Sequence, residues 1–68
     1  MLKVTLEAAR VNRHFTQKEA AMKLGVSNKT LFNWEKGISF PPADKVSLIC
    51  ALYQVEYDDL NFLPNQSA

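Results

Sequence analysis

The sequence predicts one small all-α domain built from short amphipathic helices. Apolar residues recur at the three- and four-residue spacing of helices along most of the chain. Threonine and serine stand where helices would begin, and glycine stands where they would end. With 68 residues the chain has room for a single domain. We expect this domain to cover residues 1–63 and residues 64–68 to form a flexible tail.

The first helix is expected from about residue 3 to residue 13. Leu2, Leu6 and Ala9 recur there at helical spacing and would form one apolar face. Phe15 interrupts this pattern, so the helix should end before it.

The second and third helices are predicted from their capping residues. Thr16 and Glu19 have the spacing of a capping box, in which each side chain bonds the other residue's backbone amide, so a helix should begin there. Gly25 can take the left-handed backbone conformation that ends a helix. Ser27 is a preferred N-cap residue for a third helix over residues 28–36. The turn between the two helices is so short that they must cross steeply, as in a helix-turn-helix.

Two prolines predict where a fourth helix begins. Pro41 and Pro42 force an extended break, and Pro42 suits the first position of a helix that should run to about Tyr53. The apolar residues that follow should form a short final helix or a packed turn. They are Val55, Tyr57, Leu60, Phe62 and Leu63.

The charges are distributed unevenly along the chain, although the net charge is only +1. Seven basic and three acidic side chains precede Ser39, which gives that part a net charge of +4. From Ser39 onward one lysine stands against four acidic residues, which gives −3. A polyanion would therefore be bound by the first part of the chain.

Several classes of protein are disfavoured by the composition. No apolar run approaches the roughly 20 residues that cross a bilayer, and the N-terminus lacks the apolar stretch of a signal peptide. Cys50 is the only cysteine, so no disulfide or zinc cluster can form within one chain. We therefore expect a cytoplasmic protein that does not bind membranes.

Catalysis is not expected either. A lone histidine such as His14 is usually solvated, and the carboxylates of Asp58 and Asp59 are adjacent on a surface turn, where consecutive side chains diverge. The sequence contains no glycine-rich phosphate loop and no metal-ligand spacing. We expect no enzyme activity, no cofactor, no metal and no small-molecule ligand.

The predicted third helix would carry a polar arc that includes one aromatic ring. Leu31 and Trp34 lie on the opposite side, so we expect them to be buried. Amide side chains can bond adenine at two points, lysine can donate to guanine, and an apolar side chain can pack on the methyl group of thymine. A solvated helix surface often has the same composition, so this arc alone does not establish DNA binding. At about 100° per residue it spans about 140° and contains Asn28, Lys29, Phe32, Asn33 and Lys36.

These motifs and their spacing closely resemble the phage repressor and Cro family, also called the Xre family. The resemblance extends without a gap from about Leu6 to Leu60. It implies a five-helix, lambda-repressor-like DNA-binding bundle in which helices two and three form the helix-turn-helix. The matching stretches are Phe15–Ala21, Leu24–Ser27, Thr30–Leu31, Trp34–Gly37 and Pro41.

The resemblance also implies which residues contact DNA. Asn28, Lys29 and Asn33 match the base-reading positions of the family. Phe32 lies among them, and we expect it either to contact a thymine methyl group or to make a protein contact. Gln17 matches a residue that bonds a backbone phosphate. The phosphate contacts are expected from Thr16, Gln17, Ser27, Lys36, Gly37 and Ile38.

Four further positions bear on packing or on the end of a helix. Arg10 and Glu35 match a pair that, in several family members, joins helix one to the end of helix three, and we expect a structural ion pair. Ala20 departs from the leucine usual in the family, so packing there is either looser or filled by a larger neighbour such as Phe15. Gln54 stands where a glycine that ends the helix is frequent in the family.

We therefore expect a transcriptional regulator, in the first place a repressor of prophage or mobile-element type. The resemblance implies that it acts in the cytoplasm of a bacterial or phage-infected cell, in association with the nucleoid. It would bind double-stranded DNA as a homodimer, at an operator with two-fold symmetry. Tyr57, Leu60, Phe62 and Leu63 would form the dimer contact or close the core of the monomer.

The alternative is a protein-interaction module, such as an antitoxin or antirepressor, that uses the same bundle. Phe32 and the low net charge favour it. DNA binding should weaken steeply with added salt, whereas a protein contact through Phe32 should depend on salt only weakly.

Overall fold

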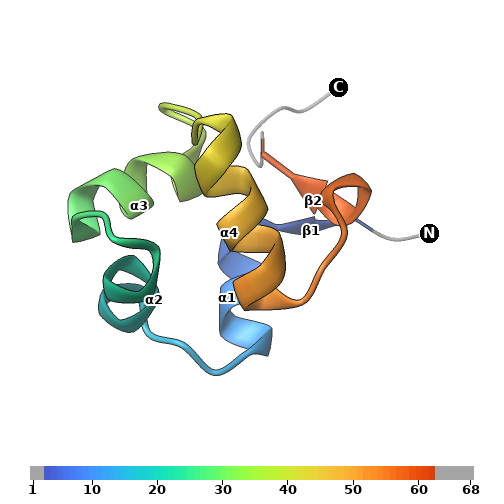
Figure 1. Ribbon diagram of the computed structural model, residues 1–68, viewed down its shortest axis with the longest axis horizontal. Coiled ribbons are helices and arrows are strands. Elements are labelled where there is room, and N and C mark those ends of the chain that lie inside the picture. Colours follow the sequence, from blue (N-terminus) through green and yellow to red (C-terminus); the bar gives the residue numbers. More distant parts are fainter. Residues whose placement is uncertain (1–2, 63–68) are drawn as a thin grey trace.

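The computed structural model describes residues 3–62. Within this range the chain is mostly helical, with four α-helices, one 3-10 helix and two very short strands (Figure 1). In chain order these elements are β1 (Val4–Thr5), α1 (Leu6–Asn12), α2 (Gln17–Leu24), α3 (Asn28–Lys36), α4 (Ala43–Tyr53), η1 (Tyr57–Asp59) and β2 (Leu60–Asn61). None of the helices within residues 3–62 combines the length and apolar character that a membrane crossing requires.

The end of the described chain differs from the expected five-helix bundle. Instead of a fifth α-helix, it forms the single 3-10 turn η1 and then the strand β2. This strand pairs in parallel with β1, with Val4 opposite Leu60 (Figure 1). The turn is closed locally, because the Asp59 carboxylate accepts a hydrogen bond from the Glu56 amide at 3.3 Å. Leu60 is then buried in extended conformation, at 4 % exposure.

Helix α1 begins later than expected, because Thr5 caps it. The Thr5 hydroxyl accepts a hydrogen bond from the Ala8 amide at 3.0 Å, which places Thr5 outside the helix in extended conformation. The residues before Leu6 thus belong to β1 and not to the helix. The helix ends at Asn12, and His14 follows with a left-handed backbone, at φ 65°.

Helices α2 and α3 have the capping contacts expected from their sequence. The Thr16 hydroxyl accepts from the Glu19 amide at 3.1 Å, and the Glu19 carboxylate accepts from the Thr16 amide at 2.9 Å. Gly25 ends α2 at φ 73°, a left-handed conformation that glycine adopts without steric cost. Ser27 then caps α3, which runs over the predicted residues 28–36.

Helix α4 begins one residue later than expected. Pro42 is extended and forms the N-cap, so that Ala43 is the first helical residue. The helix ends at Tyr53, and Gln54 adopts a left-handed conformation at φ 58°. Gln54 thus adopts the left-handed backbone conformation in which glycine is the usual residue at the end of a helix.

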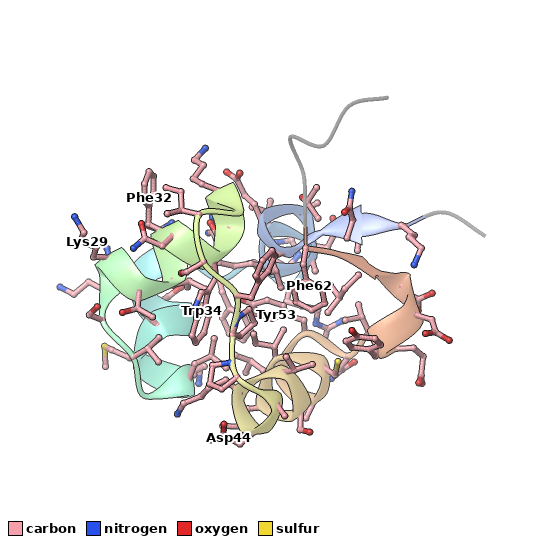
Figure 2. The ribbon with its side chains drawn as sticks, turned by 90° about the horizontal axis from the view of Figure 1, so that it is seen from above. Lys29, Phe32, Trp34, Asp44, Tyr53 and Phe62 are labelled. Carbon is pink, nitrogen blue, oxygen red and sulfur yellow. The ribbon has the colours of Figure 1, made fainter. Side chains whose placement is uncertain are left out.

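The core is formed where the helices meet. Figure 2 shows Trp34 of α3 and Tyr53 of α4 pointing into the interior of the molecule. Phe15 packs against the core, with its ring centroid 6.4 Å from that of Tyr53. Ala20 is fully buried in the same core. The buried apolar residues are Leu6, Ala9, Ala20, Ala21, Leu24, Leu31, Trp34, Ile49, Tyr53 and Leu60.

Candidate nucleic-acid interface

One face of α3 is buried in the core and the other is open to solvent. Leu31 is fully buried and Trp34 is 5 % exposed. Figure 2 shows Lys29 and Phe32 projecting from α3 on the side away from Trp34. The structure thus brings the expected base-reading residues to one accessible surface, with Asn28, Lys29 and Phe32 exposed and Asn33 half-buried.

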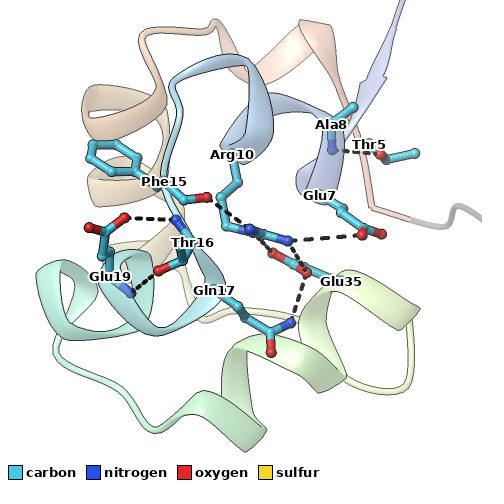
Figure 3. Close-up of polar contacts among 9 residues, drawn as sticks. All are labelled: Thr5, Glu7, Ala8, Arg10, Phe15, Thr16, Gln17, Glu19 and Glu35. Atoms are coloured by element: carbon cyan, nitrogen blue, oxygen red, sulfur yellow. Dashed lines mark hydrogen bonds and ion pairs between the residues drawn. The ribbon is translucent and has the colours of Figure 1, made fainter.

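Buried polar contacts hold α1 against the end of α3. Arg10 Nε donates to Glu35 Oε2 at 2.7 Å, and Arg10 Nη2 donates to Glu35 Oε1 at 3.4 Å (Figure 3). Arg10 and Glu35 are 8 % and 4 % exposed, so both charges are removed from water. Arg10 Nη1 also donates to the Phe15 carbonyl oxygen at 2.9 Å, which ties the loop before α2 to the same pair.

Gln17 joins this cluster from the first position of α2. Its Nε2 donates to Glu35 Oε1 at 3.0 Å (Figure 3). No local sequence pattern indicates this contact, because Gln17 and Glu35 are 18 residues apart. An amide nitrogen carries two hydrogens, so Gln17 can donate one to Glu35 and the other to an external acceptor. The buried carboxylate therefore orients the side chain that was expected to contact phosphate.

The hydroxyl of Tyr53 is buried beside the ion pair without a hydrogen-bond partner among the described residues. Burial, and secondly the negative charge of Glu35, raise the pKa of Tyr53 to about 12, while the positive charge of Arg10 acts in the opposite direction. The hydroxyl therefore stays protonated far above neutral pH. No signal in the sequence identified this group as part of the cluster.

The starts of α2 and α3 are the expected phosphate-binding positions. At each, one side-chain hydroxyl already serves as a cap: Thr16 accepts from the Glu19 amide, and Ser27 accepts from the Thr30 amide at 3.1 Å. Ser27 Oγ also donates to Thr30 Oγ1 at 2.9 Å. The first amides of a helix have no partner within it, so the amides that precede the capped one in each helix remain suited to an anion.

The segment after α3 was also expected to follow a phosphate backbone. Gly37 ends the helix at φ 77°, and the Ile38 amide donates to the Asn33 carbonyl at 2.9 Å. Ile38 has an exposed side chain, at 68 %. Lys36 Nζ lies 5.6 Å from the centroid of the Phe32 ring. Because the Ile38 amide is already bonded, Ile38 can contact a phosphate backbone only through its side chain.

The residues expected to form a dimer contact have different environments. Leu60 belongs to the buried core, whereas Tyr57 is 61 % exposed. Tyr57 and Phe62 line an open groove of about 440 Å³ together with Phe40. Leu63 lies outside the described residues, as do residues 64–68.

Residues of the types that bind metals are scattered over the described part of the chain. No group of three or more histidine, cysteine, aspartate or glutamate side chains there is arranged to hold a metal ion. Cys50 is half-buried on α4, and burial, followed by the charge of Glu56, raises the pKa of its thiol.

Comparison with known proteins places this arrangement in a family. A helix-turn-helix family model matches residues 6–60, a range that includes all four described α-helices. The HTH-type transcriptional regulator ImmR of Bacillus subtilis (strain 168) is 40 % identical over 55 residues. That match covers 81 % of this chain and 43 % of ImmR, so the chain spans less than half the length of this relative. No solved structure matches the chain. The chain therefore belongs to the Xre-type helix-turn-helix family.

Proposed function

We propose that this protein is a sequence-specific DNA-binding transcriptional regulator that places α3 in the major groove. The observation that carries this proposal is the solvent-exposed face of α3, in a chain of the helix-turn-helix family. The major groove of B-DNA is wide enough to admit an α-helix. Asn28 and Asn33 would bond adenine edges, and Lys29 would donate to guanine acceptors.

Phosphate contacts would hold α3 in register. The buried Glu35 carboxylate orients Gln17 at the start of α2, where the unpaired amides of a helix attract anions. The net charge of +4 before Ser39 adds a favourable field around this part of the chain. These contacts position the protein on DNA, and the base contacts of α3 supply the sequence preference.

The regulator would act as a homodimer on an operator with two-fold symmetry. Two copies of α3 would then read half-sites about 34 Å apart, one turn of the double helix. The resemblance to phage repressors supports repression, by occupation of the operator, in a prophage or other mobile element.

Selection of bound duplexes from a random DNA pool tests this proposal. The wild type should enrich a two-fold symmetric motif at near-physiological salt. A variant with Asn28→Ala, Lys29→Ala and Asn33→Ala should enrich none, while its circular dichroism spectrum and melting temperature stay close to those of the wild type. Absence of enrichment by folded wild-type protein would contradict the proposal.

A protein-interaction module is the second candidate, because Phe32 exposes 42 % of its surface on the same face. An antitoxin or antirepressor would use this ring against a protein partner. The dependence of binding on salt separates the two functions. Binding to DNA releases a counterion for each neutralised phosphate and so weakens steeply with salt, whereas binding through an apolar ring does not.

A further inference from the structure

The ring of Phe32 lies within the polar face of α3 and contributes little to the core. It is 42 % exposed, while its neighbour Leu31 is fully buried. Figure 2 shows the ring projecting beside Lys29, away from the interior. The monomer therefore does not require an aromatic side chain at this position, and the ring can instead serve a ligand that covers α3.

Contact with Lys36 steadies the ring. Lys36 follows Phe32 by one helical turn, and its Nζ lies 5.6 Å from the ring centroid, within cation–π distance. A side chain held in this way loses less rotamer freedom when a ligand covers it. The structure thus presents an apolar ring, in contact with one ammonium group, among the amides of α3.

We propose that Phe32 recognises the 5-methyl group of a pyrimidine in the major groove. This inference rests on the proposed function, in which α3 enters that groove. Among the groups that the four bases of DNA present there, the methyl group of thymine is the one projecting apolar group, and the bases are otherwise read there through hydrogen-bond donors and acceptors. A phenyl ring placed over polar edges would remove water from them without replacing its hydrogen bonds, which is unfavourable.

The ligand is therefore a 5-methylpyrimidine, supplied either by thymine or by 5-methylcytosine. Both bases carry the methyl group on the same carbon atom. Asn28 and Asn33, on the same face of α3, would read polar edges of neighbouring bases. The prediction is thus a single methyl-dependent position within each half-site, next to positions that are read by hydrogen bonds.

Substitution of single bases in the selected duplex tests the inference. Replacing one thymine at a time by deoxyuridine removes the methyl group and leaves the base-pairing groups unchanged. At one thymine in each half-site the wild type should lose about fourfold in affinity, the amount expected for one buried methyl group. The Phe32→Ala variant should bind the thymine and deoxyuridine duplexes equally well.

A second pair of duplexes identifies the source of the methyl group. At the sensitive position, cytosine is compared with 5-methylcytosine, each paired with guanine. A gain of about fourfold on methylation supports recognition of either 5-methylpyrimidine. A preference for thymine over deoxyuridine without this gain supports the inference with thymine as the source.

Leu48→Ala provides the matched control. Leu48 is an apolar side chain on α4 with a similar exposure of 47 %, outside the proposed DNA-reading face. This variant should keep the wild-type preference for thymine over deoxyuridine. Thermal melting of both variants verifies that they are folded.

Two results would overturn the inference on Phe32 alone: no deoxyuridine duplex binds more weakly than the thymine duplex, or Phe32→Ala keeps the wild-type preference. In either case the selected DNA motif, and with it the proposed function, would stand. If the wild type selects no DNA, both the proposed function and this inference fail.

Discussion

Replacing Arg10 with methionine should lower the free energy of unfolding by about 3 kcal/mol before it alters which DNA is bound. The change leaves the Glu35 carboxylate at 4 % exposure without its ionic partner. Loss of one partner from a buried pair typically costs about 3–5 kcal/mol. We expect the lower end of this range, because Gln17 still donates to Glu35 Oε1.

The loss should be large on the scale of the whole fold. In a domain of this size, each kcal/mol shifts the melting temperature by roughly 4–8 °C, so the variant should melt roughly 12–24 °C below the wild type. Thermal unfolding followed by circular dichroism measures this difference. Selection of DNA below the melting temperature of the variant should return the wild-type motif.

Two further variants separate the loss of a buried pair from the loss of a positive charge. Arg13→Met removes the same type of charge from an exposed position and should change the melting temperature by only a few degrees. Arg10→Met combined with Glu35→Met removes both buried charges and should recover much of the stability, because the stranded carboxylate is gone. The reasoning would be refuted if Arg10→Met melted like the wild type, or if the double variant were no more stable than Arg10→Met.

Two other variants test local features of the fold. Gln54→Gly should stabilise the protein by about 1 kcal/mol, because glycine adopts the left-handed conformation of residue 54 without steric strain; an unchanged or lower denaturant midpoint would argue against strain at this position. Tyr53→Phe should change stability at neutral pH by less than about 1 kcal/mol, because the lost hydroxyl has no hydrogen-bond partner among the described residues. Folding raises the pKa of Tyr53 from 10.0 to about 12. The contribution of the Tyr53 ionisation to the free energy of unfolding is therefore fully present below pH 10.0 and is lost as the pH rises towards 12. The Tyr53→Phe variant should therefore lose less stability than the wild type between pH 10.0 and 12, as measured by denaturant titrations. Equal losses in the two proteins would show that the ionisation of Tyr53 does not affect stability in this range.

The buried cluster also connects stability with the candidate interface. Glu35 is bonded both by Arg10 from α1 and by Gln17 from the start of α2. The ion pair therefore holds the bundle together and orients a side chain at the proposed phosphate contact. This double role explains why substitutions in the cluster need a stability measurement beside every measurement of DNA binding.

The helix-turn-helix itself could be predicted from short-range signals. The capping box of Thr16 and Glu19 and the cap from Ser27 to Thr30 each connect residues three apart, so the chemistry that starts these helices is contained in a few neighbouring letters. The buried side of α3 follows from helical periodicity in the same way. Thr5 caps α1 through a contact of the same range, with the amide of Ala8. This local signal predicts that the first helix begins after Thr5, and not at about residue 3 as expected from the apolar pattern.

The sequence by itself thus determined the order of the four α-helices, the capping of α2 and α3, and the composition of the exposed α3 face. Only the tertiary structure decided how residues 57–61 fold and what Gln17 contacts. Residues 57–61 form a turn and a strand because β1, more than fifty residues earlier, supplies a partner for Leu60. Gln17 can donate a hydrogen bond to Glu35 because α2 and α3 pack against each other. Such contacts join segments that are distant in the chain, so the periodicity and capping patterns of neighbouring residues do not predict them.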